Sequence, residues 1–319
     1  MKTVIVAGYG WSGSSALVDH LKEYKNIIEP DVEFRLIKDP YGIYDLEKHL
    51  FEEWEVINSS CAVQDFLDFC AKCNRKTGFF TGFGLNYGEK LNQNFITLAL
   101  DYVSKISMFT YKGINFSTRF KQSAIKYTWT RIKNKIPLVK ERSFCNDTLY
   151  FSKPDYSTFI EYTQDFIEEI FAEYSNSSIV LLDQAVSPIN LEQLKYFRDV
   201  KMIVVDRNPY DIYADMIRHK SLLGSDLYYT HDTSKYTQYH EGIRGVFPDK
   251  NVLYIQFEEF INNYEYNKRL IRDFIGWDLG EQKEFTLFNP DISKKNICYG
   301  KGRITKNEID EIARNLGIR

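Results

Sequence analysis

The sequence is poor in cysteine and has no long hydrophobic run. Five cysteines are an odd number in a chain of 319 residues, which argues against the disulfide framework of a small secreted protein. They stand at Cys61, Cys70, Cys73, Cys145 and Cys298. The apolar stretch at residues 3–7 is too short for a signal peptide or a membrane span. We therefore expect a cytoplasmic protein without a membrane span.

The chain also lacks a strong excess of charge of either sign. Its 41 lysines and arginines nearly balance 44 acidic residues, and the net charge is −3. This balance creates no overall field that would attract nucleic acid, so we expect no nucleic-acid partner. Aromatic residues make up 16% of the chain, which suits an apolar pocket with polar rims.

Metal-binding patterns are scarce. Cys70 and Cys73 have the spacing of a metal or redox pair, but no second pair exists and all five histidines lie elsewhere in the sequence. We predict two thiols on the buried side of a helix and no metal site.

Short apolar runs without strict alternation indicate a buried parallel sheet. The first run, residues 3–7, leads through a glycine-rich loop into a helical pattern that starts at Ser14. Further runs at 179–183, 202–206 and 252–257 precede predicted helices at 191–197, 210–219 and 260–275. The predicted fold class is α/β, with a parallel β-sheet flanked by helices.

The middle of the chain has no comparable apolar strand. Residues 47–73 and 155–173 show helical spacing, whereas 74–153 are rich in Phe, Tyr, Lys and Asn with poor periodicity. We interpret the chain as a single domain, 1–319, with a helical insert at about 74–153 that shapes an acceptor pocket. A short amphipathic helix is predicted at 304–316.

The loop after the first strand has the spacing of a phosphate-binding loop. In GxxxxGK[ST] the lysine position is held here by Ser14, which is followed by Ser15. Backbone N–H groups and the start of the next helix still suit an anion. The missing lysine disfavours an ATPase or a kinase. The predicted phosphate-binding residues are Gly10, Trp11, Ser12, Gly13, Ser14 and Ser15.

Residues 11–15 resemble the 5′-phosphosulfate loop of sulfotransferases that use 3′-phosphoadenosine-5′-phosphosulfate (PAPS). This resemblance implies a P-loop NTPase-like sulfotransferase fold with PAPS as the sulfuryl donor. In the family a lysine or arginine usually stands where this chain has Trp11.

A second motif resembles the family's 3′-phosphate-binding segment. Residues 207–211 read Arg-Asn-Pro-Tyr-Asp, and Arg207 can fork onto a phosphate. The resemblance implies that Arg207 binds the 3′-phosphate. The family has a serine eight positions later, where this chain has Asp215. Because a carboxylate cannot donate to a phosphate, either Asp215 points away or other donors such as Arg218 serve.

A third segment, residues 288–302, resembles the loop that folds over the donor in these enzymes. It is rich in lysine and glycine, which suits closure on an anion. The residues implied in donor binding are Lys294, Lys295 and Asn296.

Sulfuryl transfer needs a base for the acceptor hydroxyl. Glu33 is our first candidate, because tyrosine sulfotransferases have a catalytic glutamate at a similar spacing, with an arginine such as Arg35 shortly after it. Glu29 is the alternative carboxylate, and His231 and His240 are rival bases. His20 and His49 are predicted on helix surfaces.

Trp11 leaves the loop without the family's cation, which stabilises charge on the bridging oxygen. We expect a basic residue from elsewhere to take its place. The candidates are Arg35, Lys38, Lys140 and Arg142.

These observations predict a PAPS-dependent sulfotransferase. Its acceptor is a small hydrophobic alcohol, such as a sterol, or a glycan or lipid headgroup. One alternative is a P-loop nucleotide kinase or NTPase in which Asp206 holds Mg²⁺. Another is a non-catalytic nucleotide-binding protein. The oligomeric state is left open by the sequence.

Overall fold

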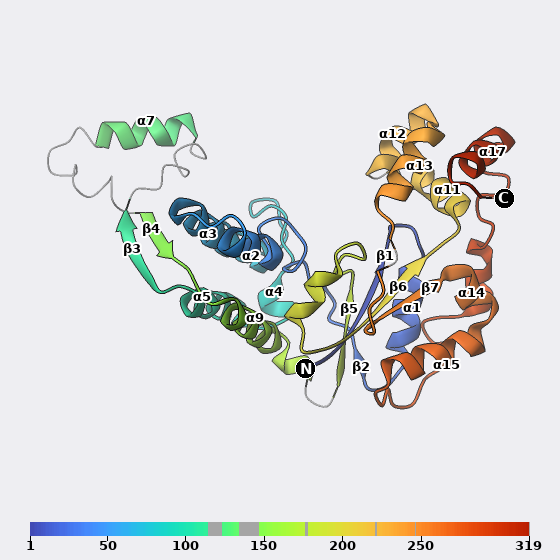
Figure 1. Cartoon of the computed structure of the whole chain (residues 1–319), viewed down its shortest axis with the longest axis horizontal. Helices are drawn as coiled ribbons and strands as arrows, with labels where there is room; N and C mark the ends of the chain where they lie inside the picture. Colours follow the sequence, from blue (N-terminus) through green and yellow to red (C-terminus); the bar gives the residue numbers. More distant parts are fainter. Residues whose placement is uncertain (114–122, 134–146, 176–177, 221, 246, 319) are drawn as a thin grey trace. The chain divides into compact units, whose positions relative to one another are not determined.

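The computed structural model describes residues 1–113, 123–133, 147–175, 178–220, 222–245 and 247–318. The chain divides into two compact units (Figure 1). Unit 1 comprises Met1–Phe34 and Ala172–Arg319, and unit 2 comprises Arg35–Phe171. The predicted insert at 74–153 lies inside unit 2.

Unit 1 is built on a five-stranded sheet in the order β2-β5-β1-β6-β7, with every neighbouring pair parallel. The predicted α/β class with a parallel sheet is therefore confirmed. Both alternating sets of side chains on β1 are buried, which explains its continuous apolar sequence. The sequence did not predict β2, which is only two residues long. The strands are β1 (Lys2–Gly8), β2 (Ile27–Ile28), β5 (Ile179–Asp183), β6 (Asp199–Asp206) and β7 (Val252–Gln256).

The helices of unit 1 follow most of the predicted positions. The predicted helix at 260–275 is instead two helices, because the backbone leaves the helical region at Asn263, and the helix predicted at 191–197 is a 3₁₀ helix. The helices are α1 (Ser14–Lys22), α10 (Ala172–Ser175), η1 (Leu191–Tyr196), α11 (Pro209–His219), α12 (Leu223–Thr230), α13 (Thr233–Gly242), α14 (Phe257–Asn262), α15 (Tyr264–Ile275), α16 (Pro290–Ser293), η2 (Lys294–Asn296) and α17 (Lys306–Asn315).

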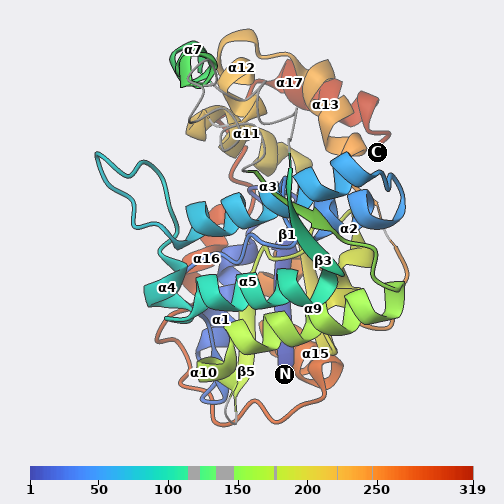
Figure 2. The ribbon, with the colours of Figure 1, turned by 90° about the vertical axis from the view of Figure 1, so that its left-hand side faces the viewer.

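Unit 2 is mainly helical, and Figure 2 shows α5 beside α9 below α3. The predicted helix at 47–73 is two helices, because Glu55 caps a new N-terminus through the N–H groups of Ile57 and Asn58. Cys70 and Cys73 lie buried on α3, as predicted, and burial raises the pKa of Cys73 to about 12. The elements are α2 (Ile43–Phe51), α3 (Val56–Asn74), α4 (Tyr87–Lys90), α5 (Phe95–Ile106), β3 (Phe109–Gly113), α7 (Ala124–Lys133), β4 (Asp147–Phe151) and α9 (Tyr156–Ile170), with β3 and β4 antiparallel.

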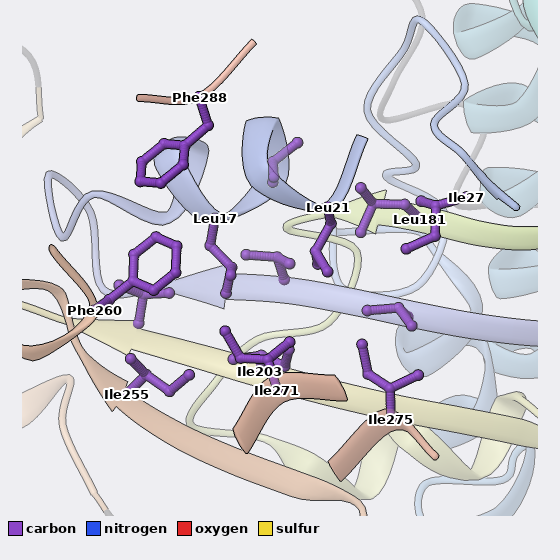
Figure 3. Packing of buried hydrophobic residues seen from close by; sticks show 14 of the residues in the cluster. Leu17, Leu21, Ile27, Leu181, Ile203, Ile255, Phe260, Ile271, Ile275 and Phe288 are labelled. Carbon is purple, nitrogen blue, oxygen red and sulfur yellow. The ribbon is translucent and has the colours of Figure 1, made fainter. Parts of the chain in front are cut away.

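The core of unit 1 lies between one face of the sheet and helices α1, α14 and α15. Figure 3 shows Leu17 and Leu21 of α1, and Ile271 and Ile275 of α15, pointing toward the strands. Leu17, Leu21 and Ile271 are almost completely buried, so α1 is fixed firmly against β1. This packing positions the loop that joins the two elements. No helix of the described chain is long and apolar enough to cross a membrane.

His20 corrects the prediction of a surface histidine. The side chain is fully buried, and the rings of Tyr24, Phe260, Tyr264 and Phe288 pack around it edge-on. The helical pattern was read correctly, but α1 turns this position toward the core. Burial lowers the pKa of His20 to about 4.

The buried imidazole predicts a loss of stability in mild acid. The unfolded chain protonates His20 near its ordinary pKa of 6.5 and the folded chain only near 4, so stability falls as the pH drops through this window. The loss attributable to His20 is about 3 kcal/mol. It is measured as the difference between denaturant unfolding curves of the wild type and His20→Gln across this pH range. An equal pH dependence in both proteins would contradict the prediction.

Candidate active site

The loop between β1 and α1 turns sharply at its glycines. Gly10 and Gly13 have φ of 82° and 83°, and Trp11 between them has φ of 51°. A Cβ on Gly8 would lie 2.0 Å from the Ser12 hydroxyl, so the loop closes tightly on its own first residue. Successive N–H groups in such a turn form a concavity that binds anions, and the N-terminus of α1 follows directly.

Some polar side chains of the loop make hydrogen bonds within the protein, and others remain available as donors. Ser14 accepts a hydrogen bond from Gln184 Nε2 at 3.1 Å, and the Gly8 N–H donates to Gln184 Oε1 at 3.4 Å. Ser12 is 1% exposed, and its hydroxyl has no hydrogen-bond partner among the residues that the structure describes. Ser15 is exposed at the start of α1. A buried hydroxyl without a partner suits an anion in this loop.

Gln184 was missed by the sequence analysis. It follows directly after β5, whose carboxyl end lies beside that of β1 in the parallel sheet. A polar residue at this position was the available signal, because ligands of open α/β sheets bind outside the carboxyl ends of the strands.

Arg207 connects three segments that are far apart in the sequence. Its side chain is buried, with 5% exposed. One terminal nitrogen, Nη1, donates to the carbonyl of Trp11 at 3.0 Å and to the carboxylate of Asp215 at 2.6 Å. The other, Nη2, donates to the carbonyl of Asn296 at 2.7 Å. The glycine loop, α11 and the C-terminal segment therefore meet at one guanidinium.

Asp215 points toward Arg207, so the suggestion that it points away is wrong. The ion pair at 2.6 Å places a carboxylate against the guanidinium that the family resemblance assigns to the 3′-phosphate. Arg218, the suggested substitute donor, binds the hydroxyl of Tyr299 at 2.5 Å. Any anion that binds Arg207 must therefore compete with Asp215.

The C-terminal segment is attached to α11 by more than Arg207. Asp211 is buried and accepts a hydrogen bond from the N–H of Gly300 at 2.7 Å. Arg303 lies 3.6 Å from the ring centroid of Tyr299. Lys294 and Lys295 are exposed, and Lys294 pairs with Asp291 at 2.7 Å. Of the three residues predicted here, Asn296 contacts Arg207, and it does so through its backbone carbonyl.

Arg244 is a cation beside the loop that the sequence analysis did not propose. Its guanidinium lies 4.8 Å from the ring centroid of Tyr9. It also forks onto Asp206, with nitrogen to oxygen distances of 3.0 to 3.2 Å. The local sequence pattern did not identify Arg244, because this residue reaches the sheet only through the turn that follows α13.

Of the four residues predicted to replace the loop cation, two lie in unit 2 and two lie outside the described residues. Arg35 and Lys38 belong to unit 2, where Arg35 pairs with Asp39 at 2.5 Å. Lys140 and Arg142 lie outside the described residues.

A cavity of about 780 Å³ opens at the carboxyl ends of β6 and β7. His240 lines it, and burial together with the positive charge of Arg244 lowers the pKa of His240 to about 4. Its Nε2 has no hydrogen-bond partner in the described part of the chain. The imidazole is therefore neutral at neutral pH, and a pKa this low also makes it a weak base. Other lining residues include Asp206, Arg207, Asn208, Glu241, Arg244 and Glu258.

The remaining candidate bases differ in their surroundings. Glu33 is exposed in unit 1, shortly after β2. Glu29 pairs with Lys22 of α1 at 2.7 Å. His231 bonds to Glu308 at 2.9 Å, and Glu308 also accepts from the buried hydroxyl of Tyr213, so His231 belongs to a structural network.

Asp206 is poorly suited to hold Mg²⁺. Both of its carboxylate oxygens accept from Arg244, and one also accepts from the backbone N–H of Arg207. Among the described residues, no cluster of three or more His, Cys, Asp or Glu has a metal-binding arrangement. Because the carboxylate of Asp206 is already bound to Arg244, the kinase alternative is less favourable.

No protein-family model matches the sequence, and no curated protein sequence matches it. Solved structures similar to it are sulfotransferases. The sulfotransferase domain of the Synechococcus PCC 7002 olefin synthase is 10% identical, with a TM-score of 0.43 over 100% of this chain and 95% of that domain. A sulfotransferase domain from the curacin biosynthetic pathway is 12% identical, with a TM-score of 0.41 over 100% and 98%.

The Alicyclobacillus acidocaldarius sulfotransferase is 11% identical, with a TM-score of 0.37 over 99% of this chain and 96% of that one. At these TM-scores the similarity does not define an activity. The function proposed below depends on the geometry of the site.

The loop geometry predicts that alanine in place of Gly13 destabilises the protein more than alanine in place of Gly10. A Cβ on Gly13 would lie 2.4 Å from the buried ring of Phe257, whereas one on Gly10 meets nothing within 4 Å. Both have positive φ, which costs about 1 kcal/mol for alanine. We expect Gly10→Ala to lower the free energy of unfolding by about that amount and Gly13→Ala by about 3 kcal/mol. Denaturant unfolding measures both, and equal losses would contradict this account of the loop.

Proposed function

We propose that this chain is a sulfotransferase that moves a sulfuryl group from PAPS to an acceptor hydroxyl. One observation carries the proposal. The three segments that resemble the family's donor-binding motifs lie far apart in the sequence, yet Arg207, which belongs to one of them, contacts both of the others. A fold that only needed a tight turn after β1 would not require this convergence.

The residues of the loop fit the 5′ end of such a donor. Its N–H groups and the start of α1 suit an anion, Ser12 offers a hydroxyl without a partner among the described residues, and the loop itself contains no carboxylate. The donor supplies an activated sulfuryl group whose bond to a phosphate oxygen breaks while the acceptor oxygen bonds to sulfur. Arg207 holds the loop carbonyl at Trp11 and so fixes the loop geometry.

The chain's own groups must then remove a proton from the acceptor and balance negative charge on the leaving phosphate. We assign the first task to Glu33. His240 is the rival because it lines the cavity at the ends of β6 and β7, although its lowered pKa makes it the weaker base. For the second task Arg244 joins Arg35, Lys38, Lys140 and Arg142 as a candidate, because it stacks on Tyr9 of the loop. The acceptor is a small hydrophobic alcohol or a glycan or lipid headgroup.

The proposal is tested by transfer of labelled sulfate from PAPS to a panel of alcohols, sterols and glycans. We expect Glu33→Gln to lower kcat by about a hundredfold or more, because general-base catalysis contributes that much. Binding of adenosine 3′,5′-bisphosphate remains unchanged in this variant. Glu29→Gln is the matched control and keeps its turnover, since Glu29 is held by Lys22.

Absence of both transfer and bisphosphate binding would remove the proposal. Bisphosphate binding without transfer to any acceptor would support the non-catalytic alternative. Mg²⁺-dependent turnover of ATP would support a nucleotide kinase.

Asp215 gives a second test of the donor site. Replacing it by serine frees the guanidinium of Arg207 and adds a hydroxyl donor at the position where the family has serine. We expect Asp215→Ser to bind adenosine 3′,5′-bisphosphate about tenfold more tightly than the wild type in calorimetry. Adenosine 5′-monophosphate, which lacks the 3′-phosphate, is the control ligand. An equal change for both ligands would show that Asp215 does not face the 3′ position.

A further inference from the structure

The connection between α3 and α4 presents three phenylalanines to solvent. Figure 2 shows this segment projecting away from the helices of unit 2. Phe79 and Phe80 are 94% and 96% exposed, and Phe83 is 77% exposed. Soluble proteins rarely expose large apolar groups together, so such a patch marks an interaction surface. We call residues 75–86 the phenylalanine loop.

The phenylalanine loop is held in shape by its own hydrogen bonds. Gly78 and Gly82 exchange N–H to carbonyl bonds of 3.1 and 2.9 Å. Thr77 both accepts from the N–H of Gly84 and donates to its carbonyl. At the base, the N–H of Asn86 donates to the carbonyl of Arg75 at 2.8 Å. The aromatic tip is therefore displayed by an ordered backbone, which reduces the entropy lost on binding.

The charge around the tip is mostly basic. Residues 69–88 contain Lys72, Arg75 and Lys76 and no acidic residue. The side chains of Arg75 and Lys76 are exposed at the base of the loop. The Lys76 ammonium lies 3.8 Å from the carboxylate of Glu89, and its side chain is 78% exposed. An apolar tip above a basic base is complementary to a surface with negative headgroups outside and hydrocarbon beneath.

We propose that the phenylalanine loop docks on an anionic lipid surface. Phe79, Phe80 and Phe83 enter the headgroup region, and Arg75 and Lys76 lie against the lipid phosphates. The bilayer is favoured over a protein partner because the rings stand on a projecting tip and because Lys72, Arg75 and Lys76 outnumber Glu89, the acidic residue beside Lys76. The docking surface is independent of the reaction proposed above.

The full chain is sedimented with vesicles of phosphatidylcholine mixed with phosphatidylglycerol, and with vesicles of phosphatidylcholine alone. We expect binding to the anionic vesicles that weakens with added salt. The variant Phe79→Ser/Phe80→Ser lowers the partition coefficient at least about tenfold, since insertion removes part of each ring from water. The matched control is Tyr229→Ser/Tyr266→Ser, which changes two exposed aromatic residues of unit 1 and leaves binding unchanged.

The basic residues are tested separately. Arg75→Gln/Lys76→Gln lowers the partition coefficient about fivefold for each charge removed and flattens its dependence on salt. Because all four altered side chains are exposed, thermal unfolding of both loop variants matches the wild type. No binding of the wild type to anionic vesicles, or equal binding by Phe79→Ser/Phe80→Ser, would overturn the proposal. It would also be overturned by self-association that this variant abolishes, because the occupant would then be a second copy of the chain.

Discussion

The arrangement of the candidate site depends on one buried guanidinium. Arg207 emerges from the carboxyl end of β6 and binds the carbonyls of Trp11 and Asn296 together with the carboxylate of Asp215. A buried charge is costly unless it is paired and hydrogen-bonded, so these partners are constrained to stay where Arg207 can reach them. The same contacts hold Trp11 in a backbone conformation that is unfavourable for a side chain of its size.

Asp215 has two consequences that oppose each other. It neutralises Arg207 and so stabilises the site when no anion is bound. It also occupies the guanidinium, so an anion that binds Arg207 must displace this carboxylate. Arg244 and Asp206 repeat this arrangement: the guanidinium of Arg244 lies over the ring of Tyr9 but is already paired with Asp206. The positive charge of the site is therefore largely compensated within the protein.

Much of the fold could be predicted because parallel strands and their helices leave local signals. The apolar runs of β1, β5 and β6 reflect burial on both faces, and the glycines after β1 reflect a turn with positive φ. The errors concern helix boundaries and packing that the sequence does not display. The sequence near Asn263 and Glu55 does not reveal that one helix ends and another begins, and the α1 pattern does not show that His20 faces a cage of aromatic rings.

The sequence by itself determined the strand, glycine loop and helix at the start of the chain, and it identified Arg207, Asp215 and the segment around Asn296 as residues of interest. These conclusions follow from backbone geometry and from spacing along the chain, which are local properties. Only the tertiary structure decided that Asp215 points at Arg207 and that Gln184 and Arg244 reach the loop. The contacts of Gln184 and Arg244 join residues more than a hundred apart in sequence and depend on strand order, which no local pattern encodes. The direction in which Asp215 points depends on how α11 packs after β6, which the spacing of eight residues does not reveal.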